Sequence, residues 1–313
     1  MESTINNIAP LRVMVLVGNG FDRAMTYPTS YSDFYKSEFI QKLVRAGNNI
    51  CNSIDSPTEK SLWSDLENGL FEYSKKITQE KGMGNEDAAK SFENDFLGLK
   101  RALFDYINNI QEGSLINDGR PRVVELKTLW EALSPQIVTF NYSRFLPVEL
   151  NNDTIHSTFS YNQTRFIPIH GTVDCPHLYK KNYYENIVLG IDDSQGVEPL
   201  HQFLYKSHQR QFKADWIFQQ IIDKRSYIIF GCSMGTSDAV YFRMLFNKQQ
   251  KGKRFLIYGH NNDNIQSLKT NMCNYIEDWN GFYNNNEICF LDFSNAECIK
   301  KTEDFVNKCL SSK

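Results

Sequence analysis

The chain has 313 residues, of which 41% are hydrophobic and 13% aromatic, and its formal net charge is −3. This length fits one core with a large insertion or two domains, and the aromatic share allows a substantial core. The charge excludes a strongly basic nucleic-acid-binding protein, although a local basic patch stays open.

The first half of the chain is predicted to be one short strand followed by a helical block. Arg12–Val17 is a nearly continuous apolar run that stops at Gly18, which is typical of a buried strand. Residues 46–60 are polar and indicate a loop, and no strand is expected between Asp22 and Ser134. Apolar residues recur with helical spacing in the remaining segments, Tyr31–Arg45, Leu62–Ile77, Ala88–Ile110 and Val123–Leu133.

The second half alternates short apolar runs with helical segments, a pattern typical of parallel βα units. We therefore predict an α/β fold, with a Rossmann-like, doubly wound, mostly parallel sheet and a large helical insertion after the first strand. The nucleotide-binding core is expected to comprise residues 1–23 and 134–313, and the insertion residues 24–133. Strands are predicted at Gln136–Phe140, Arg165–Ile169, Asn186–Leu189, Ser226–Phe230, Arg254–Tyr258 and Glu287–Leu291. Helices are predicted at Phe212–Ile222, Asp238–Phe246, Asn262–Ile276 and Asn295–Leu310.

Targeting signals and cysteine spacing bear on localisation and metal content. The N-terminal segment lacks the positive charge of a signal peptide, and no apolar run approaches the length of a membrane span. The seven cysteines are odd in number, and no two have C-x-x-C spacing. We therefore expect a cytoplasmic protein with reduced thiols and without a disulfide framework, a metal site or a membrane segment.

The first candidate motif is GNGFD at residues 18–22, directly after the first predicted strand. Glycines at such a turn let backbone N–H groups approach a phosphate. The motif differs from the dehydrogenase fingerprint, because Arg23 stands where the third glycine of G-x-G-x-x-G would be. A tight turn without a ligand explains the glycines equally well. Asp22 could bond a ribose hydroxyl or cap a helix.

Asn141 comes just after the predicted strand Gln136–Phe140, at the sheet edge where open α/β folds bind their ligands. An amide at this edge could orient a water molecule or a ribose hydroxyl. Taken alone, however, an Asn in this position more often stabilises a turn.

His170 follows the predicted strand Arg165–Ile169 and precedes Gly171, which permits a sharp turn. An imidazole at this edge could act as a general base near neutral pH. A purely structural histidine is the alternative.

A third strand–turn–helix motif, IIFGCSMGTSD, spans residues 228–238. Its glycines and Ser233 fit the G-x-S-x-G nucleophile elbow, but His260 is the one histidine that follows to complete a triad. A second nucleotide-contacting turn at Gly231 and Ser233 is therefore favoured, with Asp238 in the first turn of the next helix.

Two weaker patterns carry less information. The WSDLE segment at residues 63–67 predicts core packing together with an exposed charge at Glu67. Asp192 and Asp193 form a carboxylate pair that is typical of a solvated loop.

Taken together, these segments resemble the AbiH family of bacterial proteins that abort bacteriophage infection. The segments run in order over most of the chain, and the ordered set is specific although each segment is short. They are GNGFD (18–22), PTSYSDF (28–34), WSDLE (63–67), TFNYS (139–143), IHG (169–171), LGIDD (189–193) and FGCSMGTSDAVYF (230–242).

The same set is similar to the sirtuin-like NAD-binding domains of bacterial defence NADases. This likeness implies that Asn141 and His170 are the catalytic residues. The first turn reads GNG where sirtuins have glycine-alanine-glycine, and the four-cysteine zinc module of sirtuin deacetylases is absent from the sequence. These departures disfavour deacetylation and leave glycohydrolase chemistry open. The residues that the likeness assigns to nucleotide binding are Gly18, Asn19, Gly20, Phe21, Asp22, Gly231, Ser233 and Asp238.

The resemblance therefore implies an anti-phage effector that hydrolyses NAD at the nicotinamide–ribose bond, with NAD as substrate and no further cofactor. A non-catalytic module that senses NAD or ADP-ribose is the alternative. A nuclease or phosphohydrolase is disfavoured, because no metal-binding cluster stands out in the sequence. A phage-derived trigger, a regulatory protein and a homo-oligomer stay open as further partners.

Overall fold

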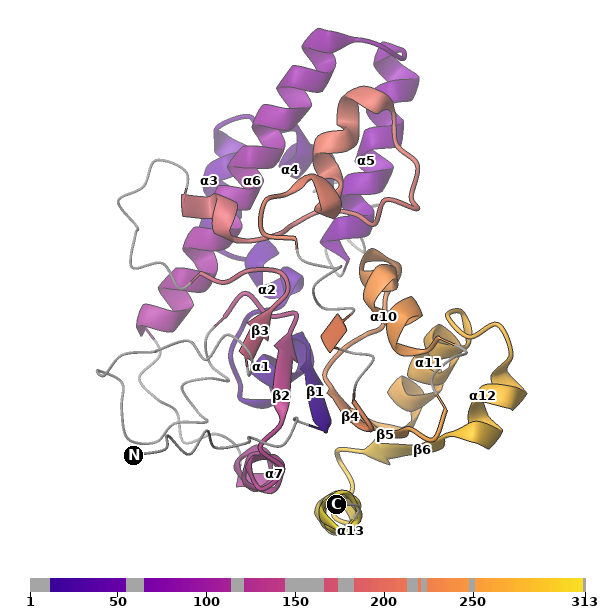
Figure 1. The fold of residues 1–313 in the computed structure, drawn as a ribbon. Coiled ribbons are helices and arrows are strands. Elements are labelled where there is room, and N and C mark those ends of the chain that lie inside the picture. The colour runs from indigo at the N-terminus through magenta and orange to yellow at the C-terminus, as the bar shows by residue number, and fades with distance from the viewer. Residues whose placement is uncertain are drawn as a thin grey trace, which may run out of the picture.

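A computed structural model of the chain describes residues 12–54, 65–113, 121–143, 166–173, 183–212, 219–220, 224–247 and 251–311. A six-stranded sheet forms its centre, with all strands parallel and in the order β3-β2-β1-β4-β5-β6 (Figure 1). The predicted α/β fold with a doubly wound parallel sheet is thereby confirmed. The strands are β1 (Val13–Val17), β2 (Gln136–Thr139), β3 (Phe166–Pro168), β4 (Ser226–Phe230), β5 (Arg254–Gly259) and β6 (Glu287–Asp292).

The direction in which strands are added reverses between β1 and β4. From β1 the sheet grows through β2 and β3 on one side, and through β4, β5 and β6 on the other. Val15 of β1 lies between Ile137 of β2 and Ile228 of β4. In open α/β sheets a ligand crevice lies beyond the carboxyl ends of the strands at such a reversal.

Helices cover both faces of the sheet. Met14 and Leu16 belong to a hydrophobic core on one face, and Val15 and Val17 belong to the core on the other. Because both faces are buried, β1 is a continuous apolar run and does not alternate with polar residues. The covering helices are α10 (Ala239–Leu245), α11 (Asn262–Cys273) and α12 (Trp279–Asn285) on one face, and α7 (Pro121–Glu131) and α13 (Cys298–Leu310) on the other.

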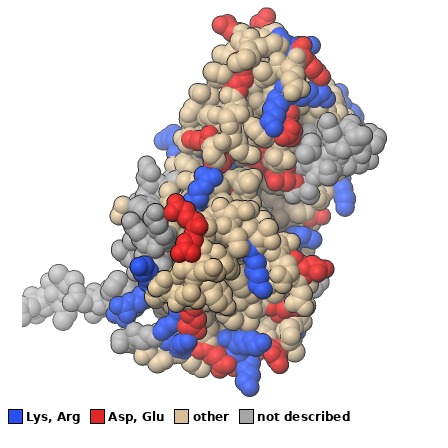
Figure 2. Space-filling view, turned by 90° about the vertical axis from the view of Figure 1, so that its right-hand side faces the viewer, with Lys and Arg blue, Asp and Glu red and all other residues tan. Residues whose placement is uncertain are grey.

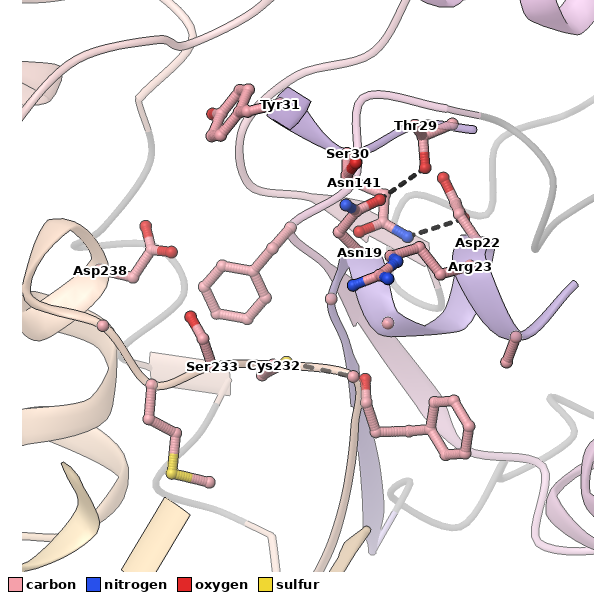
Figure 3. A pocket seen from close by; sticks show the side chains of 18 of the residues that line it. Asn19, Asp22, Arg23, Thr29, Ser30, Tyr31, Asn141, Cys232, Ser233 and Asp238 are labelled. Carbon is pink, nitrogen blue, oxygen red and sulfur yellow. Dashed lines mark hydrogen bonds between the residues drawn. The ribbon is translucent and has the colours of Figure 1, made fainter. Parts of the chain in front are cut away.

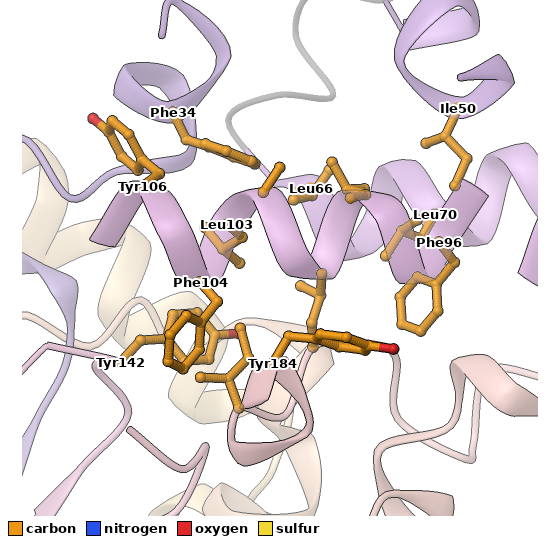
Figure 4. Packing of buried hydrophobic residues seen from close by; sticks show 14 of the residues in the cluster. Phe34, Ile50, Leu66, Leu70, Phe96, Leu103, Phe104, Tyr106, Tyr142 and Tyr184 are labelled. Atoms are coloured by element: carbon orange, nitrogen blue, oxygen red, sulfur yellow. The ribbon is translucent and has the colours of Figure 1, made fainter. Parts of the chain in front are cut away.

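A helical layer lies at one end of the molecule, away from α7 and α13 (Figure 1). Its hydrophobic core surrounds the longest helix, where Leu70, Phe96 and Leu103 pack with Tyr184 from beyond β3 (Figure 4). Segments that precede β2 and follow β3 are thus joined in one core. The layer consists of α2 (Tyr31–Tyr35), α3 (Glu38–Arg45), α4 (Asn49–Ile54), α5 (Leu66–Lys81) and α6 (Glu86–Gly113), with the short 3-10 helices η2 (Tyr183–Asn186), η3 (Pro199–Leu204) and η4 (Lys206–His208).

The helical layer differs from the sequence prediction in two places. The helix predicted at Tyr31–Arg45 is divided into α2 and α3, because Ser37 begins a new helix and its hydroxyl bonds the Phe34 carbonyl at 2.6 Å. The predicted loop at 46–60 contains α4. The Asn48 side chain accepts a hydrogen bond from the Cys51 amide at 3.1 Å, which caps that helix.

Three further segments remain to be compared with the sequence prediction. The run Asn186–Leu189 is not a strand of the sheet, and Ile187 makes an isolated antiparallel bridge with Gly171 instead. Its apolar side chains are buried in the core of the helical layer, and a short apolar run alone does not reveal which core it joins. Helix α12 was not predicted. Most of the helix predicted at Phe212–Ile222 lies outside the described residues.

The charged side chains are mixed on the face of the molecule shown in Figure 2. Lysine and arginine side chains lie among aspartate and glutamate side chains over the described part of this face. Such a mixture is that of an ordinary hydrated surface. None of the helices in the described residues is both long enough and apolar enough to cross a membrane.

Candidate functional site

A cavity of about 1070 Å³ opens at the carboxyl edge of the sheet, where the strand order reverses. The segments after β1, β2, β4 and β5 line it, together with the start of α2 and α5 from the helical layer. It brings together the residues that the sequence predicted for the site, with one exception. Those that line it are Gly18, Asn19, Gly20, Asp22, Asn141, His170, Gly231, Ser233 and Asp238.

Phe21 is the exception, because it does not line the cavity and its side chain points away from the predicted nucleotide site. Its side chain is fully buried in the core between the sheet and helices α7 and α13. The ring lies edge-on to Phe230, with the two ring centroids 6.1 Å apart. Phe21 therefore anchors α1 (Asn19–Ala24) to the sheet while its neighbours Gly20 and Asp22 reach the cavity.

The glycines of the turn after β1 allow its backbone to pack directly against the backbone of the turn after β4. A Cβ atom at Gly20 would lie 2.5 Å from Gly231 Cα, and one at Gly18 would lie 2.5 Å from the Gly231 carbonyl oxygen. The Gly20 amide donates to the Gly231 carbonyl at 3.0 Å, and the Gly18 amide donates to the Phe230 carbonyl at 2.9 Å. These two amides are therefore engaged, and the expected cradle of amides for a phosphate is not formed by them.

Asp22, Asn141 and Ser143 form a buried polar cluster in the cavity lining. Figure 3 shows Asp22 beside Asn141, with the hydrogen bond between them. Asn141 Nδ2 donates to Asp22 Oδ1 at 2.8 Å, and Ser143 Oγ donates to Asp22 Oδ2 at 2.5 Å. The turn that carries Asn141 is held by a bond of 3.1 Å from its amide to Thr139 Oγ1. The Asn141 amide is thus fixed in orientation, and its buried Oδ1 has no hydrogen-bond partner among the described residues.

The ionisation of Asp22 is set by burial. The side chain is buried, and this burial raises the pKa of Asp22 to about 6, although the hydrogen bonds from Ser143 and Asn141 favour the ionised form. Asp22 does not cap a helix, since it lies within the first turn of α1, whose N-cap is Gly18. It lines the cavity and holds the Asn141 side chain, and its contact with a ribose hydroxyl stays a prediction.

His170 lies in a second polar cluster, formed with Asp238, Lys206 and Glu67. His170 Nε2 is 2.9 Å from Asp238 Oδ1, and Lys206 Nζ is 2.8 Å from the same oxygen. Lys206 Nζ also lies 2.9 Å from Glu67 Oε1, so one ammonium group joins two carboxylates. The cluster connects α5 of the helical layer with the turn that precedes α10.

The charges of this second cluster decide which of its carboxyl groups is ionised. Burial opposes the ionisation of Asp238, but the Lys206 ammonium and the hydrogen bonds from His170 and Lys206 outweigh it, and the pKa of Asp238 lies below its ordinary value. Burial raises the pKa of Glu67, and Lys206 offsets only part of this effect. Burial also opposes the charge on Lys206, yet the two carboxylates raise the pKa of its ammonium.

Lys206 and Glu67 were missed by the sequence analysis. Glu67, predicted as an exposed charge, is 5% exposed, and Lys206 is 2% exposed. Their separation of 139 positions in the sequence leaves no local signal for the pair. Asp192 was also misjudged as a solvated carboxylate, because it is buried and accepts hydrogen bonds from the Ser194 hydroxyl and the Val240 amide.

The motif at residues 228–238 forms a turn after β4, and it does not form a catalytic triad in the described residues. Ser233 lines the cavity, but no hydrogen bond joins its hydroxyl to a histidine in the part of the chain that the structure describes. Asp238, the acid nearest to it in sequence, is bonded to His170 instead. The turn is held from outside by Asn271, whose side chain donates to the Ser233 carbonyl at 2.9 Å.

Comparisons with known proteins place the chain in a family. No curated protein matches the chain. A family model described as bacteriophage abortive infection AbiH matches residues 14–260, which is most of the chain. The match covers the cavity lining except for Asn264, Asn271 and Phe293. The chain therefore belongs to the AbiH family, whose role is bacteriophage abortive infection.

Proposed function

We propose that this protein acts in abortive infection by hydrolysing NAD at the nicotinamide–ribose bond. One observation carries the proposal: Asn141 and His170, which lie on separate strand ends, line a single cavity at the reversal of a parallel sheet. An amide that orients and an imidazole that accepts a proton are complementary groups for such a hydrolysis. The cavity volume is in the range of small-molecule and cofactor sites.

The chemistry requires a site that binds ribose and directs one water molecule. The bond between ribose C1′ and the nicotinamide nitrogen breaks, and the nitrogen keeps the electron pair, so neutral nicotinamide leaves. The water oxygen bonds to C1′, and a proton of that water passes to a base. The transition state resembles an oxocarbenium ion, as in glycoside hydrolysis.

Each polar group of the cavity suits one part of this reaction. Asn141 Oδ1 is an unpartnered acceptor among the described residues, and it could receive a ribose hydroxyl or the attacking water. His170 would accept the proton of the water. The ionised Asp238 carboxylate, which also lines the cavity, would favour the positive charge that develops on the ribose ring.

The test is the release of nicotinamide from NAD by the purified protein, and in bacterial cells by the protein expressed there during phage infection. Asn141→Ala and His170→Ala should each lower nicotinamide release by about a hundredfold or more, the scale of a positioned acid–base group. His208→Ala is the matched control, because His208 is exposed and lies outside the cavity lining. Tight binding of NAD or ADP-ribose without any release, in both settings, would replace hydrolysis with sensing.

A further inference from the structure

We propose that Lys206 is a positioning residue that holds His170 as the Nε2–H tautomer and leaves Nδ1 as its basic nitrogen. The inference rests on the proposed function only for its consequence in catalysis. The tautomer itself is a property of four side chains, the buried Lys206, Glu67 and His170 and the partly exposed Asp238, which we call the ammonium cluster.

The contacts of Lys206 use all the protons that its ammonium can donate. Nζ lies 2.8 Å from Asp238 Oδ1, 2.9 Å from the Ser237 carbonyl, and 2.9 and 3.1 Å from the two Glu67 oxygens. A fourth neighbour, His170 Nε2, is the most distant at 3.5 Å. An ammonium group has three N–H bonds, and the three oxygen groups take them. No proton of Lys206 is left for His170.

The remaining contact of His170 then fixes its tautomer. Nε2 is 2.9 Å from Asp238 Oδ1, and an ionised carboxylate oxygen can only accept a hydrogen bond. Nε2 must therefore carry the proton and donate it to Asp238. In the neutral ring Nδ1 is the unprotonated nitrogen, and no hydrogen bond joins it to a described residue.

Aromatic side chains surround the His170 ring in the part of the chain that the structure describes. Phe140 lies edge-on to the His170 ring, with ring centroids 5.5 Å apart. The rings of Tyr142 and Tyr241 lie 6.0 and 6.4 Å away, and burial raises the pKa of both phenols, which keeps them neutral. Tyr31, 3.4 Å from the Tyr142 hydroxyl, is neutral for the same reason.

Removal of the ammonium would disturb the acceptor of the His170 proton. Lys206 Nζ is 2.8 Å from the Asp238 oxygen that faces His170 Nε2, and 2.9 Å from Glu67 Oε1. Carboxylates in this position are costly without the cation, so Glu67 or Asp238 would take up a proton or turn toward water. Without a fixed acceptor at Nε2 the imidazole can carry its proton on either nitrogen, and Nδ1 is then the basic nitrogen in only part of the molecules.

Nitrogen-15 NMR of histidine-labelled protein tests the inference directly. The chain has six histidines, and His170→Gln identifies the His170 signals. In the wild-type protein at neutral pH, Nε2 should show the shift of a protonated nitrogen and Nδ1 that of an unprotonated one. An Nδ1–H tautomer, or an imidazolium in the wild-type protein, would overturn the inference without the use of any variant.

The substitution Lys206→Met then removes the positive charge and keeps a side chain of similar size. The His170 signals should show a mixture of the two tautomers, and nicotinamide release should fall by up to about a hundredfold, because only part of the molecules then present a basic Nδ1. Lys100→Met is the matched control, because Lys100 is also buried but donates to Gln209 at 2.8 Å, outside the cavity lining. An unchanged His170 spectrum in a folded Lys206→Met protein would exclude the positioning role.

The two proposals fail in different ways. If the wild-type protein shows the Nε2–H tautomer but releases no nicotinamide, the positioning inference stands and the hydrolase proposal fails. If nicotinamide is released but His170 carries its proton on Nδ1, the hydrolase proposal stands and the role of Lys206 is excluded.

Discussion

The hydrogen bonds around Asp22 explain how a carboxyl group can be buried at the edge of the sheet. Asn141 and Ser143 each donate to one of its oxygens, so both acceptors are satisfied without water. These bonds favour the ionised form, whereas burial favours the protonated form, and burial prevails. Asp22 therefore loses its proton near pH 6, at a higher pH than an ordinary carboxyl group.

The raised pKa of Asp22 makes the stability of the fold depend on pH. A carboxyl group with a pKa near 3.8 when unfolded and about 6 when folded favours folding while it is protonated. This contribution is fully present below pH 3.8 and is lost as the pH rises through about 6. The difference between the two pKa values corresponds to about 3 kcal/mol in the free energy of unfolding. Asp22→Asn should remove it, so that the variant gains stability relative to the wild-type protein between pH 4 and pH 7.

Urea unfolding at several pH values between 4 and 7 measures this effect. Asp304→Asn, an exposed carboxylate on α13, is the control and should change the free energy of unfolding by less than about 0.5 kcal/mol at each pH. A constant difference between wild-type and Asp22→Asn proteins across this range would contradict the role given to burial.

At the scale of elements, the sheet was predictable because its central strands are buried on both faces. Continuous apolar runs such as Val13–Val17 and Ser226–Phe230 leave little choice of structure, and their alternation with helices implies parallel strands. The run at Asn186–Leu189 has the same local character but packs in the helical layer. Both kinds of run are apolar because they are buried. Four residues alone do not show whether such a run joins the sheet or packs against helices.

The site residues that follow directly after strands could be predicted from the sequence. The residues that pair with others far away in the sequence could not. Asn141 and His170 stand directly after strands, so the parallel fold alone brings them to one edge. Lys206 pairs with Glu67, from which it is separated by 139 positions, and the glycines of the first turn make way for Gly231, more than two hundred residues further along. Such contacts are properties of the folded chain and leave no periodic pattern.

The turn after β4 is an element whose shape depends on helix α11 and the residues that follow it. Met234 has a positive φ of 54°, which is unfavourable for a residue with a side chain. The Tyr275 hydroxyl lies 2.9 Å from the Gly235 carbonyl and 3.1 Å from the Met234 carbonyl, and Asn271 donates to the Ser233 carbonyl. These contacts hold the turn against the cavity.

Tyr275→Phe should therefore loosen the turn while the hydrophobic packing of the ring is retained. We expect a loss of about 1 kcal/mol in the free energy of unfolding, the usual contribution of one hydrogen bond. Amide hydrogen exchange should become faster at residues 232–236. Tyr283→Phe is the control, since that side chain is 52% exposed. Faster exchange spread evenly over the sheet, with none concentrated in this turn, would show that Tyr275 has no local role.

At the scale of the whole molecule, three parts of the fold line the cavity. Ser30 and Tyr31 come from the start of the helical layer, Asn141 from one half of the sheet, and Ser233 from the other half (Figure 3). His170 belongs to the same half of the sheet as Asn141. The ammonium cluster is the described polar link between the helical layer and the turn before α10. A ligand in the cavity would therefore contact all three parts at once.

Binding of ADP-ribose, the hydrolysis product under the proposed function, should thus protect three separated segments from amide hydrogen exchange. We expect slower exchange at residues 19–33, 141–143 and 231–238 together, because each contributes to the cavity lining. At a concentration of about 100 times Kd the ligand should also add about 2.7 kcal/mol to the free energy of unfolding. Helix α13 packs on the same face of the sheet as α7 and contributes no residue to the cavity lining, so it should gain only this global stabilisation. Protection confined to one of the three segments would mean that the ligand occupies a smaller site, and the view of the cavity as one dinucleotide-sized site spanning the helical layer and both halves of the sheet would have to be abandoned.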